Sequence, residues 1–277
     1  MELLFLGTGA ATALPLPFCN CETCAHARAA GGKDIRRRSS VLIDGNILLD
    51  LGPDSVSAAL TYGADFGALG CLLQTHAHSD HFDAGHLITR MPEYATRAQN
   101  KLRLFASRAC ISQMSNMLAR EESGATLEDD LWLKKLEMDV QPLAHGDRAW
   151  FDNYEIIAVE SAHDVPGGSL MYIVRRGASA FFYACDTPLL TDNAWSLLES
   201  LDFPLTAAAI DQTYGPSTPG GGHMHADQVA ETAARLRCKR TYATHISHEG
   251  TPPHAALEAW TRARGYLVAY DGMRISV

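Results

Sequence analysis

The sequence has little that would suit it to a membrane or to a long nucleic acid. No apolar run approaches the roughly 18 residues that a membrane-spanning helix needs. Asp and Glu (32) outnumber Lys and Arg (23), so the formal net charge is -9, whereas proteins that neutralise many phosphates need the opposite balance. We therefore expect a small-molecule substrate, with neither a membrane nor a long nucleic acid as partner.

The N-terminal stretch lacks the basic start and the apolar run of a signal peptide. "MELLFLGTGAATALPLP" breaks at glycine after a few apolar residues, which predicts a strand and a turn. Four of the seven cysteines are scattered, at Cys71, Cys110, Cys185 and Cys238. Unpaired thiols of this kind are typical of a reducing compartment, so we expect a cytoplasmic protein.

The chain also lacks short repeats and low-complexity tracts. Its 277 residues, 47% of them hydrophobic, can bury a full core, and we expect one domain over residues 1–277. Short strand-like runs alternate with helical patterns in both halves, and a DG turn at 44–45 predicts a hairpin. This favours an α/β fold of mixed sheets covered by helices, with two similar halves packed sheet on sheet. The polar segment 123–139 is interpreted as a solvated helix and turn.

The strongest motif is H-x-H-x-D-H in "THAHSDHFDAGH", made by His76, His78, Asp80 and His81. It follows an apolar strand, and residues two apart on an extended chain point the same way, so the first two histidines can share a metal ion. Asp80 and His81 follow where the chain turns, so they can serve a second ion. His86, further on, is expected to lie on a helix surface or behind a ligand.

One short motif cannot complete two metal spheres, so further ligands should end other strands. Three positions qualify, His163 after "IIAVESA", Asp186 after "FFYAC" and His245 after "TYAT". A strand-end His or Asp is more often a cap or turn residue. Their occurrence together behind H-x-H-x-D-H favours metal binding instead.

A second cluster, "CNCETC", places Cys19, Cys21 and Cys24 within six residues. In a reducing compartment such a cluster indicates a metal site before a disulfide. Local sequence offers His26 as a fourth ligand. Three thiolates and one imidazole in a closed tetrahedron favour zinc, so we expect a structural zinc loop at about 18–26.

The motif and its downstream partners resemble the metallo-β-lactamase superfamily of metal-dependent hydrolases over nearly the whole chain. The resemblance implies an αββα sandwich with the site at one edge of the paired sheets. It implies one ion held by His76, His78 and His163, another held by Asp80, His81 and His245, and Asp186 as the bridging carboxylate. Two ions about 3.5 to 4 Å apart would make a shared water into a hydroxide nucleophile. Such a site suits Mn or Zn, and also Fe or Ni.

Three features narrow the resemblance. They are the cysteine cluster together with "THISH" at 244–248, "GGGHMHADQVAETA" at 220–233, and the terminal "YDGMRISV". They are similar to the phosphoribosyl cyclic phosphodiesterases of the carbon-phosphorus lyase pathway, which open a 1,2-cyclic phosphate on ribose. This likeness implies that His248 completes the structural zinc site and that His223 is catalytic. We count Asp80 with His223 as a predicted catalytic residue.

The role of His223 is chemically reasonable, because opening a cyclic phosphodiester leaves an alkoxide that an imidazole can protonate. His225 is the rival for that role, with a helix N-terminal position as its alternative. Other readings remain. A tRNA 3′-end endonuclease needs a basic docking arm, which this sequence does not show, because "RRR" at 36–38 is a short cluster expected at a sheet edge or against a substrate phosphate. A pyrroloquinoline quinone biosynthesis-like protein or a non-catalytic metal-binding module are further alternatives, and a homodimer is left open.

Overall fold

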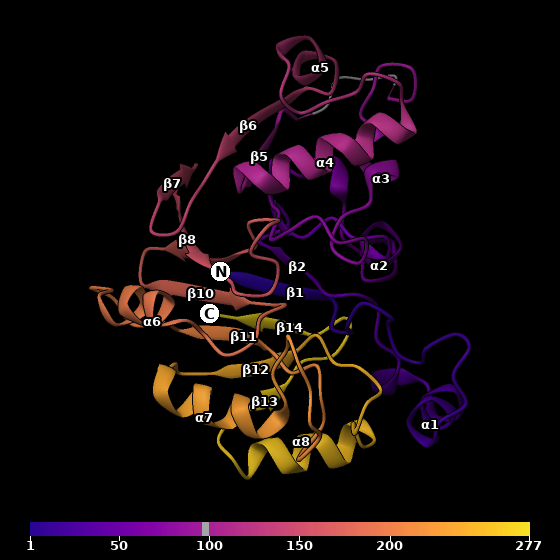
Figure 1. Cartoon of the computed structure of the whole chain (residues 1–277), viewed down its shortest axis with the longest axis vertical. Coiled ribbons are helices and arrows are strands. Elements are labelled where there is room, and N and C mark those ends of the chain that lie inside the picture. Colours follow the sequence, from indigo (N-terminus) through magenta and orange to yellow (C-terminus); the bar gives the residue numbers. More distant parts are fainter. Residues whose placement is uncertain (96–99) are drawn as a thin grey trace.

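The computed structural model describes residues 1–95 and 100–277. Two seven-stranded sheets lie face to face, and helices cover their outer faces, so the predicted αββα arrangement is confirmed (Figure 1). In spatial order, the first sheet contains β14 (Arg274–Ser276), β1 (Glu2–Gly7), β2 (Ser40–Ile43), β3 (Ile47–Leu49), β4 (Cys71–Leu73), β5 (Leu102–Ala106) and β6 (Met138–Pro142). The second contains β13 (Leu267–Val268), β12 (Thr241–Thr244), β11 (Ala207–Asp211), β10 (Ser179–Ala184), β9 (Leu170–Arg176), β8 (Tyr154–Glu160) and β7 (Arg148–Phe151).

The helices belong to one layer on each side and to a separate lobe at the N-terminal loop. They are α1 (Glu22–Ala30), α2 (Ser55–Thr61), α3 (Ala84–Ile88), α4 (Arg108–Glu121), α5 (Asp130–Lys135), α6 (Asp192–Glu199), α7 (Ala226–Leu236) and α8 (His254–Arg262), with 3-10 turns at Gly32–Asp34 and Phe66–Ala68. No helix in the described part of the chain is long and apolar enough to cross a membrane.

The main core lies between the two sheets. Phe5 from β1 and Tyr172 and Phe181 from the second sheet are all fully buried in it. A second apolar layer joins the first sheet to α2, α3 and α4, and a third joins the second sheet to α6 and α7. Both faces of the central strands are therefore buried, which explains why these strands are continuous apolar runs in the sequence.

The two Asp-Gly sequences, at 44–45 and 271–272, form turns that connect different kinds of strand pair. Asp44 and Gly45 both have positive φ (48° and 70°) and join β2 to β3 as the predicted hairpin. At the second, Gly272 has φ 85°, but the turn carries the chain from β13 in one sheet to β14 in the other. Local sequence alone does not distinguish a hairpin from a change of sheet.

The segment 123–139 contains the predicted helix, α5, but its last residues enter β6, which sequence reasoning missed. Arg36 also differs from expectation. Arg36 is buried and donates to Thr8 Oγ1 (2.8 Å) and to the Ala269 carbonyl (2.7 Å), while Arg38 pairs with Asp54 (3.0 Å). Arg36 is thus buried beneath the loop after β1 and stabilises it through these bonds.

Strand direction decides where the functional side chains meet. β3, β4, β5 and β6 run parallel to one another, as do β10, β11, β12 and β13. The carboxyl ends of parallel strands lie at one edge of a sheet, which is where side chains for a site gather. The H-x-H-x-D-H segment follows β4, and Asp186 and His245 follow β10 and β12, so the two sheets present them together.

Candidate metal centre

The H-x-H-x-D-H loop is held by a buried carboxylate at the end of β3. Asp50 is fully buried, and its Oδ1 accepts from the backbone N–H and the hydroxyl of Thr75 (2.8 and 2.9 Å). Its Oδ2 lies 2.8 Å from His81 Nδ1. Gln74 adds two bonds, donating to the carbonyls of His76 and His81 (2.8 and 2.9 Å). The loop is therefore fixed at both ends by groups from β3 and β4.

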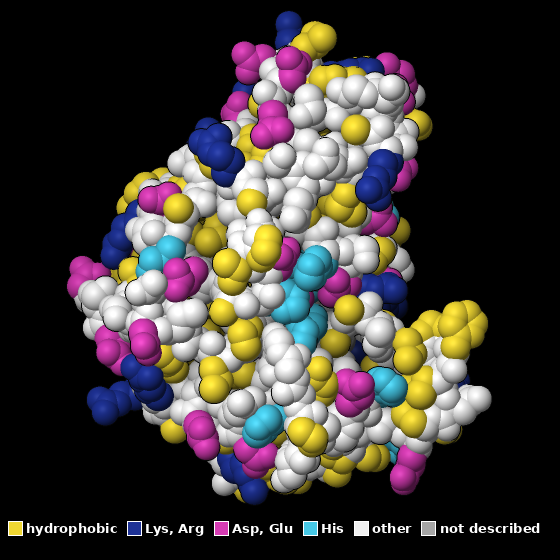
Figure 2. Space-filling view, viewed as in Figure 1, with side chains coloured by type: hydrophobic (Ala, Val, Ile, Leu, Met, Phe, Trp, Pro, Cys, Tyr) yellow, Lys and Arg dark blue, Asp and Glu magenta, His cyan; other side chains and the backbone are white. Residues whose placement is uncertain are grey.

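The structure brings the seven residues of the predicted active-site ligand set together. Their donor atoms fall into two groups within 4.8 Å that share one carboxylate, His76, His78, His163 and Asp186 in one and Asp80, His81, Asp186 and His245 in the other. On the face shown in Figure 2, several histidine side chains form a patch near the centre of the molecule with acidic side chains beside it, while other histidines lie apart from it. The buried cluster can accommodate two metal ions.

Asp186 is the centre of this arrangement. Its Oδ2 lies 3.1 Å from His76 Nε2 in one group and 3.0 Å from His81 Nε2 in the other. Its Oδ1 lies 3.4 Å from His163 Nδ1. Around His81, Asp80 Oδ2 approaches Nε2 to 3.0 Å and stands 3.6 Å from His245 Nε2. One carboxylate thus faces both groups, the geometry that a bridging ligand requires.

The buried nitrogen atoms test whether these residues fit metal ions. The Nε2 atoms of His76, His81 and His245 are buried and make no hydrogen bond, although carboxylate oxygens of Asp186 and Asp80 lie 3.0 to 3.6 Å from them. Their Nδ1 atoms are occupied, by Thr75 Oγ1 (3.0 Å), Asp50 Oδ2 (2.8 Å) and Thr213 Oγ1 (2.8 Å) respectively. Buried polar atoms rarely lack a partner, and metal-ligating histidines usually anchor their second nitrogen in this way. The donor set therefore fits divalent metal ions.

Backbone geometry at the strand ends is unusual in the same place. Asp50, Asp186 and His245 have φ of 65°, 57° and 58°, in the left-handed region that side-chain-bearing residues rarely adopt. Each is the residue at which a buried strand gives way to the site. Such conformations cost about 1 to 3 kcal/mol each and persist where surrounding structure requires them.

The buried carboxylates of the cluster place negative charge close together, and nearby positive charge stabilises it. Burial raises the pKa of Asp186, but the surrounding histidines, His245 first, lower it well below its usual range. Burial lowers the pKa of His81, but the charges of Asp80 and Asp50 outweigh it and raise that pKa well above its usual value. Protonated imidazoles and metal ions are alternative ways of supplying this charge, because a metal ligand must give up its proton.

His223 lies beside this centre and His225 does not join it. His223 Nδ1 is 3.0 Å from Asp186 Oδ1 and 2.9 Å from Asp211 Oδ2. Burial lowers its pKa, but the hydrogen bonds to Asp186 and Asp211 outweigh this and raise it to about 10. His225 precedes α7, where its backbone N–H donates to Gln228 Oε1 (3.1 Å). His86 Nε2 turns to the Pro53 carbonyl (3.1 Å) and belongs to neither group.

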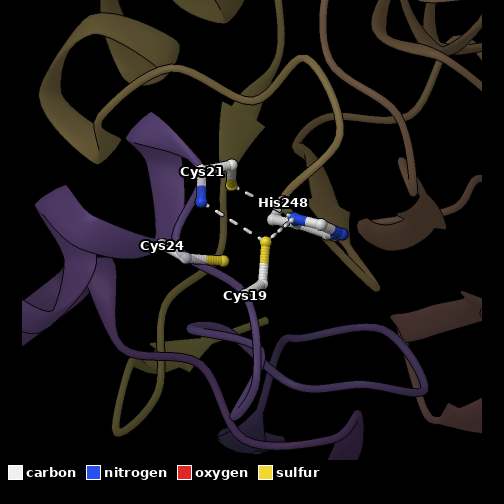
Figure 3. Close-up of side chains that lie close together, drawn as sticks. All are labelled: Cys19, Cys21, Cys24 and His248. Carbon is white, nitrogen blue, oxygen red and sulfur yellow. Dashed lines mark hydrogen bonds between the residues drawn. The ribbon is translucent and has the colours of Figure 1, made fainter.

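The cysteine cluster forms a separate site at the start of α1. Cys19, Cys21, Cys24 and His248 have donor atoms within 4.8 Å of one another, and the three thiols point toward the imidazole (Figure 3). The Nδ1 of His248 is 3.5 Å from Cys19 Sγ and 3.3 Å from Cys21 Sγ. His26 instead stands 3.8 Å from Asp34 and is half-exposed. The cluster could hold a third metal ion.

Sequence reasoning missed three residues of the centre. Asp50 follows β3, Asp211 is the last residue of β11, and both are fully buried, while Cys185 has its thiol within 4.8 Å of His81 and His245. Asp211 Oδ1 also accepts from Thr213, whose hydroxyl meets His245. A signal was present, since both carboxylates end an apolar run just as Asp186 does.

Comparison with known proteins agrees with this geometry. The model of the beta-lactamase superfamily domain matches residues 45–246, well over half of the chain. Among solved structures, a diphosphatase from the PhnP family is similar, with 24% identity and a TM-score of 0.72 over 100% of this chain and 97% of the other. Zn²⁺-bound PqqB from Methylobacterium extorquens has 16% identity and a TM-score of 0.76, covering 100% of both chains.

The short form of human tRNase Z has 18% identity and a TM-score of 0.66, covering 100% of this chain and 99% of that one. At such identities the likeness concerns the fold. No curated protein sequence matches the chain. The family match, the paired sheets and the buried His and Asp cluster agree, and the chain belongs to the metallo-β-lactamase superfamily.

Proposed function

We propose that the protein is a metal-dependent phosphodiesterase that hydrolyses a small cyclic phosphodiester of the 5-phosphoribosyl 1,2-cyclic phosphate type. The observation that carries the hydrolase assignment is the shared carboxylate of Asp186, which faces unpartnered Nε2 atoms of both groups. Two divalent ions, when bound, supply Lewis acidity for a phosphoryl oxygen and lower the pKa of a water molecule.

The residues of the chain divide the remaining work. His76, His78 and His163 would hold one ion, and Asp80, His81 and His245 the other, with Asp186 between them. Asp50 and Thr213 fix the rings of His81 and His245 through their Nδ1 atoms (2.8 Å each), which orients the Nε2 lone pairs. Zn and Mn suit these nitrogen and carboxylate donors, with Fe and Ni as alternatives.

His223 would donate a proton to the oxygen that leaves phosphorus. Asp211, 2.9 Å from its Nδ1, keeps that nitrogen protonated, so the opposite nitrogen can give its proton to a developing alkoxide. His223 also lines a cavity next to His245, within reach of a bound substrate. Asp80, which the sequence predicts to be both a metal ligand and a catalytic residue, would act here by helping to hold the second ion.

The substrate class is supported by the position of His223 beside Asp186 and Asp211 and by the cysteine cluster with His248, two features that resemble the phosphoribosyl cyclic phosphodiesterases. The similar diphosphatase from the PhnP family makes a diphosphate the nearest alternative substrate. A tRNA 3′-end endonuclease is a second alternative, but Arg36 and Arg38, the candidates for a basic arm, are engaged by the chain's own groups. We propose one domain, zinc at the cysteine cluster and a small phosphodiester as the partner.

Substrate competition tests the proposal. The metal-loaded protein should be assayed with 5-phosphoribosyl 1,2-cyclic phosphate, a 2′,3′-cyclic nucleotide, a sugar-nucleoside diphosphate and a pre-tRNA. We expect kcat/KM for the first to exceed the others by orders of magnitude. A preference for the diphosphate or the pre-tRNA would move the assignment to that class, and bound metal without turnover of any of them would leave only a metal-binding module.

Substitution of the histidines tests the mechanism. His223→Ala should retain its metal content yet lose about 100- to 10,000-fold in kcat on the cyclic substrate, the usual contribution of a positioned proton donor. His225→Ala serves as the control, because it sits at the start of α7 and should keep most of its activity. The reverse result would transfer the role to His225.

A further inference from the structure

A cavity of about 150 Å³ opens beside the metal centre. His223 and His245 form its inner wall, and residues 10–12, 213–214 and 247–249 form the rest. On the visible face, the surface is hollowed between the histidine patch and the lobe that carries α1 (Figure 2). The volume is below the roughly 300 to 1,000 Å³ of pockets that enclose drug-sized ligands, so one small ring suits it better than a nucleoside.

The walls of the cavity are fixed by backbone hydrogen bonds. The carbonyl of Glu249 accepts from Gly215 N (2.9 Å), while its N–H donates to Ser247 Oγ (3.1 Å). Ser247 N donates in turn to the Thr213 carbonyl (3.0 Å), and Ala10 N to the Ile246 carbonyl (3.1 Å). The backbone that carries Glu249 is therefore held in place relative to the metal centre.

Close packing explains why the opposite wall needs glycine. A Cβ on Gly7 would stand 1.9 Å from the Arg38 carbonyl oxygen, and one on Gly9 would stand 2.9 Å from that of Arg37. Any side chain would therefore push the loop after β1 away from the arginine segment. With glycine at both positions, residues 10–12 lie against residues 246–249 and narrow the cavity.

The polar groups of the cavity determine which ligand it can take. Glu249 is one of the residues that line the cavity, it is exposed, and it makes no ion pair with any residue in 1–95 or 100–277. The hydroxyls of Thr12 and Tyr214 make only long contacts with carbonyls, of 3.4 Å each. A carboxylate only accepts hydrogen bonds, so its ligand must bring donors. Hydroxyl groups meet this requirement, whereas a second phosphate beside Glu249 would be repelled.

We propose that this cavity binds the sugar ring of the substrate and that Glu249 accepts a hydrogen bond from a ring hydroxyl next to the leaving oxygen. This inference rests on the proposed function. In a ribose 1,2-cyclic phosphate, the free hydroxyl on C3 neighbours the oxygen on C2. Glu249 and His223 line the same cavity, so one can hold the C3 hydroxyl while the other faces the C2 oxygen.

The reaction balances without another reactant. Water adds to phosphorus, the bond from phosphorus to the C2 oxygen breaks, and that oxygen takes a proton from His223. The proton released by the attacking water restores the imidazole through solvent. Glu249 exchanges no proton in this scheme. It is a specificity-determining residue that aligns the leaving oxygen with the proton donor.

Glu249→Gln tests the inference, with Glu128→Gln as the matched control on the exposed segment before α5. We expect Glu249→Gln to lower kcat/KM for the cyclic sugar phosphate by about 10- to 100-fold, the loss of one charge-assisted hydrogen bond. On the 3-deoxy analogue, the same substitution should cost less than about threefold, because the two changes remove one interaction. Glu128→Gln should behave as the wild type.

A binding measurement separates the subsite from catalysis. In calorimetric titration with D-ribose 1-phosphate, Glu249→Gln should bind at least about tenfold more weakly than Glu128→Gln. Equal losses on the natural and 3-deoxy substrates, or unchanged binding, would overturn the subsite. Wild-type turnover of bis(p-nitrophenyl) phosphate but of no cyclic sugar phosphate would instead overturn the proposed function.

Discussion

The chain contains two clusters of side chains that could hold metal ions, and they are built in opposite ways. The His and Asp centre collects its residues from strand ends in both sheets, and most of them are buried. The cysteine cluster takes three residues from one short segment that runs into α1, and a fourth, His248, from 229 positions beyond Cys19. A catalytic site needs rigid elements and an open position for substrate, whereas a structural site needs four closed ligands.

The thiols themselves show the contrast. His248 lowers the pKa of the exposed Cys21 to about 6 through a hydrogen bond, while burial raises the pKa of Cys24 to about 11. Soft thiolates are suited to zinc and need no sheet to position them. The two clusters meet in one segment, because His245 and His248 lie three residues apart after β12. A substitution that displaces this segment can therefore alter ligand positions in both clusters.

The largest expected effect is at the shared carboxylate. Asp186→Ala should reduce hydrolysis to background, well beyond the roughly 10- to 100-fold that loss of an outer partner costs, because both groups lose a ligand. The chain should remain folded, since the core between the sheets does not depend on Asp186. Metal content by mass spectrometry, far-ultraviolet circular dichroism and kinetics check this. Retained turnover in metal-replete Asp186→Ala would refute the ligand assignment.

The next largest effect is on stability, at the cysteine cluster. His248→Ala should lose one metal per chain, from about three to about two, and lower the free energy of unfolding by about 3 to 5 kcal/mol. The reason is that a clip closing so long a loop restricts the unfolded chain strongly. Denaturant titration with metal analysis measures both. If His248→Ala kept three metals and an unchanged denaturation midpoint, the cysteine cluster would not be a structural metal site that includes His248.

A smaller effect is expected behind the metal ligands. Asp50→Asn keeps the shape of the side chain but weakens the 2.8 Å contact with His81 Nδ1. Metal affinity at the second site should fall by about 10- to 100-fold, the usual cost of losing an outer partner. Competition with a chromogenic chelator measures it. Equal weakening of all three sites would instead indicate a general loss of structure.

Local spacing nominates most of the residues that the structure brings together at the candidate centre, and distant contacts explain the residues that it missed. H-x-H-x-D-H is recognisable because its residues are adjacent, and Asp186 and His245 because each ends an apolar run. Asp50 ends such a run too, but a strand-end carboxylate has the same local signature whether it caps a turn or orients a histidine. Only the 2.8 Å approach of His81, 31 residues away, distinguishes the two.

The fold shows the same limit. Paired sheets follow from alternating apolar runs and helices, yet α1 was not predicted, because among its residues only Cys24 and Ala27 are buried and the apolar periodicity is weak. Arg36 was assigned to the sheet edge or a phosphate because a basic triplet usually lies outside. Its partners Thr8 and Ala269 are 28 and 233 residues away, and no local pattern reveals them.

The smallest effect is expected at His26, and it sharpens the comparison of the two clusters most directly. His26 lies two residues after Cys24 and is the fourth ligand that local sequence offers, but its contact is Asp34, at 3.8 Å on a half-exposed side chain. Exposed ion pairs contribute at most about 1 kcal/mol. His26→Ala should therefore retain all three metals and shift the unfolding free energy by less than about 1 kcal/mol. If His26→Ala lost a metal and His248→Ala lost none, His26 would be the fourth ligand. The cysteine site would then involve only the N-terminal segment and would have no ligand from the active-site segment.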